Sequence, residues 1–370
     1  MKEHWYQIEN INDIDSPALV VYRERVAENI QTAIKMTGNL DRLRPHVKTH
    51  KSKEVADMMI EAGINKFKCA TIAEAEMLGM SGAPDVLLAY QPFGPKQKRF
   101  IDLIKKYPGT KYSCLIDNLA VAKSLACIAT NNDLEIAIYL DLNVGMNRTG
   151  IAPGREAIDL YLQCSELDGI LPAGLHAYDG HIRSTDINER ISECDKAFAP
   201  VVEMQQELMQ HGFPRPILIA GGSPTFPVHA KKNDRECSPG TFIYWDKGYE
   251  SSFPDQRFLT AALVISRIIS FPGKGKICLD LGHKSIAAEN TLEKRVTFLN
   301  APGFKFIGQS EEHLIVQAEE NHSYKVGDVF YGLPYHICPT VALYERALIA
   351  ENGMIENDWK VIARDRKINV

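Results

Sequence analysis

The amino-acid sequence predicts an α/β protein built from a closed (β/α)8 barrel of the TIM type and a second, mainly β domain. Two observations predict the barrel. Short apolar runs alternate with amphipathic segments through about the first 250 of the 370 residues, and several runs lack the alternation of a half-exposed strand. A third observation predicts the second domain, because the helical period fades after about residue 255.

The apolar runs are at most ten residues long, which suits strands buried on both faces of a parallel sheet. They are Leu43–His50, Phe67–Thr71, Val86–Tyr90, Tyr112–Asp117, Ile136–Asn143, Gly169–Tyr178, Ile217–Gly221 and Thr241–Trp245. The segments between them predict helices over Glu24–Met36, Lys53–Ala62, Ile72–Gly79, Lys96–Lys106, Asn118–Ala129, Arg155–Ser165 and Glu189–Gln210. Eight such alternations suit a closed barrel, and an open doubly wound sheet is the alternative.

The C-terminal third of the sequence predicts strands separated by turns. These strands are Ala261–Ile269, Lys276–Asp280, Arg295–Phe298, His313–Ala318, Val329–Tyr331 and Trp359–Arg364. The early strand Ala18–Tyr22 is expected to pair with them. We therefore expect a barrel domain over residues 23–254 and a β domain formed by residues 1–22 and 255–370.

Composition excludes several classes of protein. The net charge of −5 provides no basic face for a nucleic acid, and no apolar run approaches the ~20 residues that span a membrane. The polar start predicts no secretory signal. Eight cysteines without a CxxC pair predict reduced thiols. We expect a cytoplasmic enzyme with a small-molecule substrate.

Polar residues at the carboxyl ends of barrel strands are the first place to look for chemistry. The first strand ends in Arg44–Lys51, a segment with two lysines and two histidines. A solvated loop is the plain interpretation of such a cluster. A buried lysine, however, has a lowered pKa and becomes a usable nucleophile, as Schiff-base chemistry requires.

The segment Arg44–Lys51 resembles the pyridoxal-phosphate lysine motif of the D-threonine aldolase and D-serine dehydratase family, which is related to bacterial alanine racemase. The resemblance extends over nearly the whole chain, from Pro17–Val21 to Trp359–Arg366. It implies a fold-type III enzyme that binds pyridoxal 5′-phosphate covalently through Lys48, with Lys51 as the alternative lysine.

Two further strand ends resemble this family. In Asp141–Gly150 the second half resembles its G-M-x-R-x-G signature, which implies that Arg148 approaches the phenolic oxygen of the cofactor; a salt bridge at a helix end is the alternative. In Gly174–His181 the resemblance implies that Tyr178 meets the pyridine nitrogen. A neutral hydroxyl there makes the ring a weaker electron sink. His176 and His181 are alternatively structural histidines.

Small residues near the last two strands predict a phosphate site, since glycines and hydroxyls let backbone N–H groups approach an anion. The resemblance implies the same role for these residues, and plain turns are the alternative. The predicted phosphate residues are Gly222, Ser223 and Thr225 after the seventh strand, and Gly240 and Thr241 at the start of the eighth.

A second motif, Leu333–Thr340, contains His336 and Cys338. On an extended segment, residues two positions apart point to the same side, so both side chains can reach one ion. An imidazole and a thiolate are ligands that suit zinc. A half-buried strand with a free cysteine is the alternative. The family binds a divalent ion through such a pair, and His-x-Cys resembles the zinc form of D-serine dehydratases. We expect zinc in preference to manganese.

The resemblance implies a lyase that acts on a D-β-hydroxy amino acid. We expect retro-aldol cleavage of the D-threonine aldolase type, giving glycine and an aldehyde, because Asp280–Ser285 and Ser310–His313 resemble that branch. D-serine dehydratase activity, giving pyruvate and ammonia, is the alternative. An amino-acid racemase, a non-catalytic pyridoxal-phosphate-binding protein and a cofactor-free metal hydrolase are less favoured. The family also implies a homodimer.

Overall fold

The computed structural model describes residues 4–370, and these divide into two compact units. The barrel unit comprises Gln31–Lys48, Lys53–Gly240 and Asp365–Val370. The β unit comprises the residues up to Ile30, Thr49–Ser52 and Thr241–Arg364. The domain boundaries expected from the sequence remain a prediction, because compactness does not test which segments fold independently.

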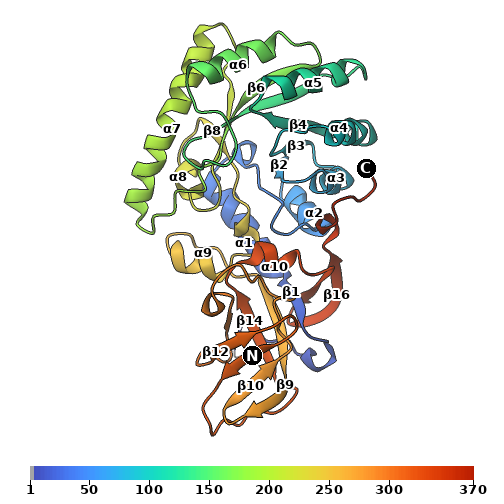
Figure 1. Cartoon of the computed structure of the whole chain (residues 1–370), viewed down its shortest axis with the longest axis vertical. Coiled ribbons are helices and arrows are strands. Elements are labelled where there is room, and N and C mark those ends of the chain that lie inside the picture. Colours follow the sequence, from blue (N-terminus) through green and yellow to red (C-terminus); the bar gives the residue numbers. More distant parts are fainter. Residues whose placement is uncertain (1–3) are drawn as a thin grey trace. The chain divides into compact units, whose positions relative to one another are not determined.

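The barrel unit contains seven parallel strands in sequential order (Figure 1). Most of their apolar residues are buried on both faces, as in most parallel sheets, with Leu171 and Ile217 near strand starts as exposed exceptions. The strands are β2 (Lys66–Cys69), β3 (Asp85–Leu88), β4 (Lys111–Ile116), β5 (Ile136–Leu142), β6 (Ile170–Ala177), β7 (Ile217–Ala220) and β8 (Arg235–Cys237). Sequential parallel pairing places all of their carboxyl ends at one rim.

The segment 43–47 closes the barrel between β8 and β2. The amide of Arg44 donates to Cys237 O at 2.9 Å, and the amide of His46 donates to Pro239 O at 2.8 Å. On the other side, the amide of Val47 donates to Lys68 O at 2.9 Å. The segment therefore takes the place of the eighth strand, which confirms the closed barrel and excludes the open sheet.

Helices follow the strands and cover the outside of the barrel (Figure 1). Several begin at a side-chain cap, as where Thr71 Oγ1 accepts from the Glu74 amide and Asn118 accepts from two amides. The longer helices are α1 (Arg23–Thr37), α2 (Lys53–Glu61), α3 (Ile72–Met80), α4 (Pro95–Lys106), α5 (Leu119–Thr130), α6 (Arg155–Ser165) and α7 (Ile187–Gln210). Each lies within a few residues of its predicted range. The short helix α8 (Phe226–Ala230) follows β7.

The β unit is built on a mixed sheet, in which β1 (Ala18–Tyr22) pairs antiparallel with β9 (Ala262–Gly273) and parallel with β15 (Arg346–Glu351). This confirms the expected pairing of the N-terminal strand. The other strands are β10 (Lys276–Leu279), β11 (Val296–Phe298), β12 (Lys305–Gln309), β13 (Leu314–Gln317), β14 (Val329–Pro334) and β16 (Met354–Lys360). Two short helices, α9 (Lys247–Ser252) and α10 (Ile337–Val341), complete the unit.

Two strand predictions were wrong. The apolar segment Thr241–Trp245 begins with a 3-10 helix over Thr241–Ile243, and the last barrel strand is the shorter and more polar β8. Residues Ile362–Arg364, predicted as the end of a strand, also form a 3-10 helix. Periodicity alone does not separate a short buried helix from a short buried strand. Over residues 4–370, every helix is too short or too polar to cross a membrane.

Arg44 stabilises the closure of the barrel. Its side chain is about 1% exposed, with Nε 2.6 Å from Glu236 Oε2 and Nη1 2.6 Å from Asp85 Oδ1. A buried guanidinium is tolerated because two carboxylates compensate its charge. Lys66 Nζ also contacts Glu236, at 2.5 Å.

We expect Arg44→Met to lower the free energy of unfolding by about 3–5 kcal/mol, because Asp85 loses its cation and the largely buried Glu236 keeps only Lys66. Urea unfolding followed by circular dichroism measures the change. Arg155→Met removes an exposed ion pair with Asp159 and is the control. It should cost less than about 1 kcal/mol. Equal losses in the two variants would contradict a role for Arg44 in closure.

Candidate functional site

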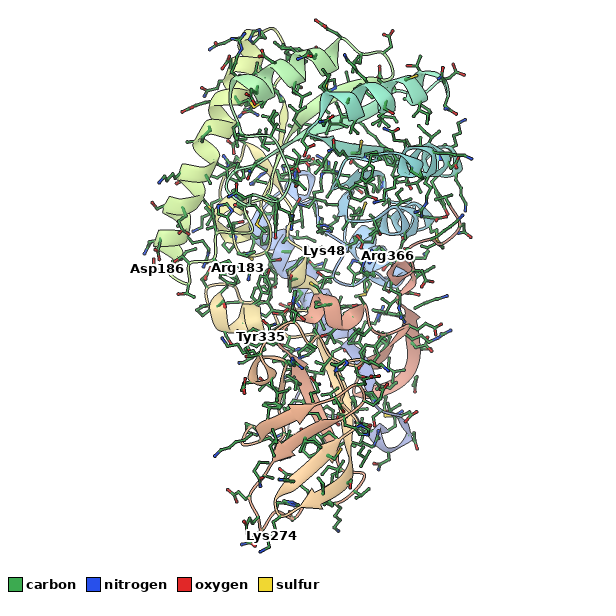
Figure 2. The ribbon with its side chains drawn as sticks, viewed as in Figure 1. Lys48, Arg183, Asp186, Lys274, Tyr335 and Arg366 are labelled. Atoms are coloured by element: carbon green, nitrogen blue, oxygen red, sulfur yellow. The ribbon has the colours of Figure 1, made fainter. Side chains whose placement is uncertain are left out.

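Lys48 directly follows the closing segment 43–47, at the rim formed by the carboxyl ends of the strands (Figure 2). Its backbone amide donates to His46 Nδ1 at 3.3 Å, and its half-buried side chain reaches toward Tyr178, with Nζ 6.0 Å from the centre of the ring. Lys51 belongs to the β unit and has a left-handed backbone (φ 53°). Its carbonyl accepts from Ala363.

Three cationic side chains surround the ring of Tyr178, which follows β6. The Lys48 amine lies 6.0 Å, the Lys68 amine 5.9 Å and the Arg148 guanidinium carbon 5.0 Å from the ring centre. Such distances permit attraction between a cation and the ring face. The structure therefore brings the predicted residues Lys48, Arg148 and Tyr178 together, and Arg148 remains exposed.

Lys68 on β2 is a site residue that our sequence analysis did not single out. Its side chain is buried, with Nζ 3.4 Å from His176 Nε2, and His176 Nδ1 is 2.7 Å from Asp141 Oδ1. Burial lowers the pKa of Lys68, and the nearby charge of Lys48 lowers it further, to about 7. The sequence did contain one signal for this residue, because Lys68 lies inside Phe67–Thr71, a run predicted to be a strand buried on both faces.

The loop after β7 packs closely on Tyr178. A Cβ atom at Gly222 would lie 2.8 Å from a carbon of the tyrosine ring, so a larger residue would displace the ring. Ser223 Oγ accepts a hydrogen bond from the amide of Gly240 at 3.1 Å, which ties the two predicted phosphate loops together. Ser238 Oγ is buried and has no hydrogen-bond partner among the described residues.

Asp179 fixes the geometry of the same loop. It accepts hydrogen bonds from Thr225 Oγ1 and His229 Nε2, both at 2.7 Å, and Cys194 Sγ lies 3.7 Å away. Burial favours a raised pKa for Asp179, but His229 and Thr225 outweigh burial and lower it. The hydroxyl of Thr225 therefore orients the loop.

Asp179, Cys194 and His229 lie close enough to hold an ion, with ligand atoms within 4.8 Å of one another. However, burial raises the pKa of the Cys194 thiol well above its ordinary value, and Asp179 raises it further. A zinc ligand is a thiolate. These residues are therefore better described as a buried hydrogen-bond network.

The predicted metal pair lies in the β unit, where it begins a short helix rather than an extended segment. His336 is the N-cap of α10 and has extended backbone, whereas Cys338 lies in the first turn. The two side chains nevertheless interact by a hydrogen bond. The expectation that a strand aligns them was wrong, because β14 ends at Pro334 and α10 begins at Ile337, two residues after Tyr335, which is labelled in Figure 2.

Glu289, which our sequence analysis did not single out, orients His336. Its Oε1 lies 2.5 Å from His336 Nδ1, which leaves Nε2 as the nitrogen for an ion, as in many metal sites. Burial lowers the pKa of His336, but Cys338 and Glu289 outweigh burial and raise it to about 9. No residue pattern links position 289 to position 336.

Two hydroxyls flank the Cys338 sulfur. Thr49 Oγ1 lies 3.2 Å and Thr241 Oγ1 3.8 Å from Sγ. Thr241, predicted from the sequence to bind phosphate, is thus found beside the predicted metal ligand within the β unit. Thr49 is peptide-bonded to Lys48.

Comparison with known proteins agrees with this fold. Residues 21–247 match the alanine racemase N-terminal domain, and residues 261–350 match the putative serine dehydratase domain. The chain is 24% identical over 359 residues to the D-threonine aldolase of Arthrobacter sp, covering 95% of this chain and 93% of that protein. It is 23% identical over 366 residues to the D-threo-3-hydroxyaspartate dehydratase of Delftia sp. (strain HT23), covering 92% and 96%.

The crystal structure of D-threonine aldolase from Filomicrobium marinum superposes with a TM-score of 0.87 at 24% identity, covering 98% of this chain and 99% of that one. This likeness extends over both units. It confirms the predicted fold class, a barrel of the alanine racemase type with a second, mainly β domain.

We expect Asp179→Asn to lower the free energy of unfolding at pH 7 by about 2–3 kcal/mol, because two hydrogen bonds to a buried carboxylate are weakened. The lowered pKa of Asp179 means that its contribution is present above about pH 4 and is lost as the pH falls further. The difference from the wild type should therefore narrow in acid. Urea unfolding between pH 7 and about pH 3.5 measures it, with the exposed Asp159→Asn as control.

Proposed function

The chain belongs to the alanine racemase N-terminal domain family, and we propose that it is a pyridoxal-phosphate-dependent lyase that acts on a D-β-hydroxy amino acid. The observation that carries this proposal is the placement of Lys48 and Arg148 around the ring of Tyr178 at the rim of the barrel. The relatives support it by their names, since they cleave or dehydrate D-threonine and D-threo-3-hydroxyaspartate.

The residues fit the cofactor. Lys48 would bond to its aldehyde, Arg148 would neutralise its phenolic oxygen, and Tyr178 would lie at its ring nitrogen. The phosphate would take Gly222, Ser223 and Gly240, together with the buried hydroxyl of Ser238, whose oxygen has no partner among residues 4–370. Bound pyridoxal phosphate supplies an electron sink for negative charge at the α-carbon of the substrate.

We propose a divalent ion, zinc in preference to manganese, at His336 and Cys338. The Glu289 carboxylate holds the imidazole so that Nε2 is presented, and the thiol of Cys338 provides a soft ligand. Two protein ligands leave positions for the substrate hydroxyl. Thr49, in contact with Cys338, is peptide-bonded to Lys48.

We propose aldol cleavage, giving glycine and an aldehyde, as the main reaction. Similarity to D-threonine aldolases across nearly the whole chain supports it. Dehydration to a keto acid and ammonia is the second candidate, because residues 261–350 match a putative serine dehydratase domain. The homodimer and the cytoplasmic location remain predictions.

One assay separates these reactions. The protein, supplied with pyridoxal phosphate and Zn²⁺ or Mn²⁺, is incubated with D-threonine and with D-serine, and acetaldehyde plus glycine is measured against pyruvate plus ammonia. Acetaldehyde supports the aldolase, and pyruvate supports the dehydratase. If neither forms although cofactor and metal are bound, the lyase proposal is wrong.

We expect Lys48→Ala to abolish the visible absorption of the bound cofactor and its loss on borohydride reduction, because the covalent bond to the amine is gone. Turnover should disappear with it. Lys51→Met is the matched control and should retain both properties. Retention of the band in Lys48→Ala together with its loss in Lys51→Met would assign the cofactor to Lys51.

We expect Cys338→Ala to reduce the metal content from about one ion per chain to a small fraction, because one of two protein ligands is removed. The cofactor band should persist while turnover falls. Metal analysis by mass spectrometry and the absorption spectrum measure the two effects. Cys127→Ala changes an exposed cysteine of the barrel unit and is the control. Full metal content in Cys338→Ala would exclude the cysteine as a ligand.

A further inference from the structure

Lys68 is a buried amine beside the proposed cofactor site, and the proposed function gives it no role. It lies on β2 and is 2% exposed, and its amine is 5.9 Å from the centre of the Tyr178 ring. Lys48 approaches the same ring at 6.0 Å. Two amines therefore approach the Tyr178 ring, and the proposed covalent bond to the cofactor would use one of them.

Lys68 is the first donor in a chain of two hydrogen bonds: Lys68 donates to His176, and His176 donates to Asp141. Burial raises the pKa of Asp141, but His176 outweighs it and lowers the pKa, so Asp141 is ionised and accepts the Nδ1 proton of His176. Burial and Lys68 lower the pKa of His176, which is therefore neutral. Its Nε2 presents a lone pair, and Lys68 donates to it at 3.4 Å. One proton of the amine is held in place by this chain of contacts.

The charges around Lys68 do not fix it as an ammonium ion. Its nearest hydrogen-bond partner is a neutral imidazole rather than a carboxylate, and burial penalises its charge. The charged and titratable groups that face it come from the closing segment and the residue after it, β5, β6 and the loop after β6. They are Arg44, Lys48, Asp141, His176, Tyr178 and Asp179. The cations Arg44 and Lys48 disfavour a positive charge on Lys68, whereas the carboxylates of Asp141 and Asp179 favour it. Both protonation states of Lys68 are therefore accessible near neutral pH.

We propose that Lys68 is a second acid–base group of the site, and that His176 and Asp141 are its positioning residues. As an amine it accepts the β-hydroxyl proton of the substrate, and as an ammonium ion it returns one proton to the α-carbon of the glycine formed on cleavage, so its charge is restored in each turnover. This inference rests on the proposed function and adds a proton carrier beside Lys48. Its amine lies 5.9 Å from the centre of the Tyr178 ring, beside which the proposed function places the cofactor.

Two variants separate acid–base chemistry from charge alone. Lys68→Arg keeps a cation and a donor to His176 but cannot release its proton, whereas Lys68→Met removes both. An acid–base role predicts that both variants lose turnover by about 100-fold or more. If Lys68 only supplied charge, Lys68→Arg would retain most of the activity, and that result would overturn the proposal.

A second measurement does not depend on turnover. In protein labelled with ¹³C at the lysine Cε atoms, one resonance should titrate with a midpoint near pH 7 in the cofactor-free chain and should be missing in Lys68→Arg. Lys66→Met, which alters the same strand at the ion pair with Glu236, should retain that resonance. A midpoint near pH 10 for Lys68 would overturn the proposal.

The outcomes distinguish this inference from the function on which it rests. If the wild type binds the cofactor through Lys48 and turns over substrate, while Lys68→Arg is fully active, the acid–base role is wrong and the lyase stands. If the wild type has neither the absorption band nor activity, the proposed function itself fails. Unchanged thermal midpoints in the Lys68 variants would exclude misfolding as the cause of lost turnover.

Discussion

The hydrogen bonds that join segment 43–47 to β8 and β2 close the barrel and so position the residues at its rim, including Lys48. Segment 43–47 donates to carbonyls beyond β8 and at β2, and the buried side chain of Arg44 pairs with Asp85 and Glu236. Without these contacts the sheet would have two open edges and Lys48 would have no fixed position. Closure of the barrel therefore gives Lys48 a defined position at the rim, although it follows an irregular segment.

The electrostatics of the pocket follow from that geometry. Cations from three different parts of the barrel approach one aromatic ring, whereas the carboxylates of Asp141 and Asp179 are hydrogen-bonded to imidazoles. Asp141 holds His176, whose other ring nitrogen contacts Lys68. Asp179 holds His229, whose Nδ1 has no hydrogen-bond partner among the described residues. The Asp179–His229 pair orients a loop, whereas the Asp141–His176 pair orients Lys68.

The sequence was sufficient for the parts of the fold that depend on local pattern. Strands buried on both faces, such as β5, and helices with one apolar stripe were predicted to within a few residues. Strand β8 was not, because its three residues are mostly polar while the nearby apolar segment from Thr241 is a buried 3-10 turn. Burial there depends on tertiary packing, which periodicity does not report.

The candidate site was predictable where residues lie at strand ends and carry a family motif, as Lys48, Arg148 and Tyr178 do. Glu289 and the contact of Thr241 with Cys338 were not predictable, since they depend on how distant segments of the β unit fold together. Lys68 lay within a predicted strand. Its role could be inferred only from the structure, which shows that its hydrogen-bond partner is the imidazole of His176 rather than a carboxylate.

The buried amine of Lys68 also affects the folded state as a whole. Its pKa is about 7 when folded, and near 10.4 in an unfolded chain. Between these values the unfolded chain binds more protons, so this group makes folding more favourable as the solution becomes alkaline. At neutral pH the buried amine therefore lowers the free energy of unfolding, which an apolar residue at this position would not do. Such a loss of stability is common where a residue is retained for its chemistry.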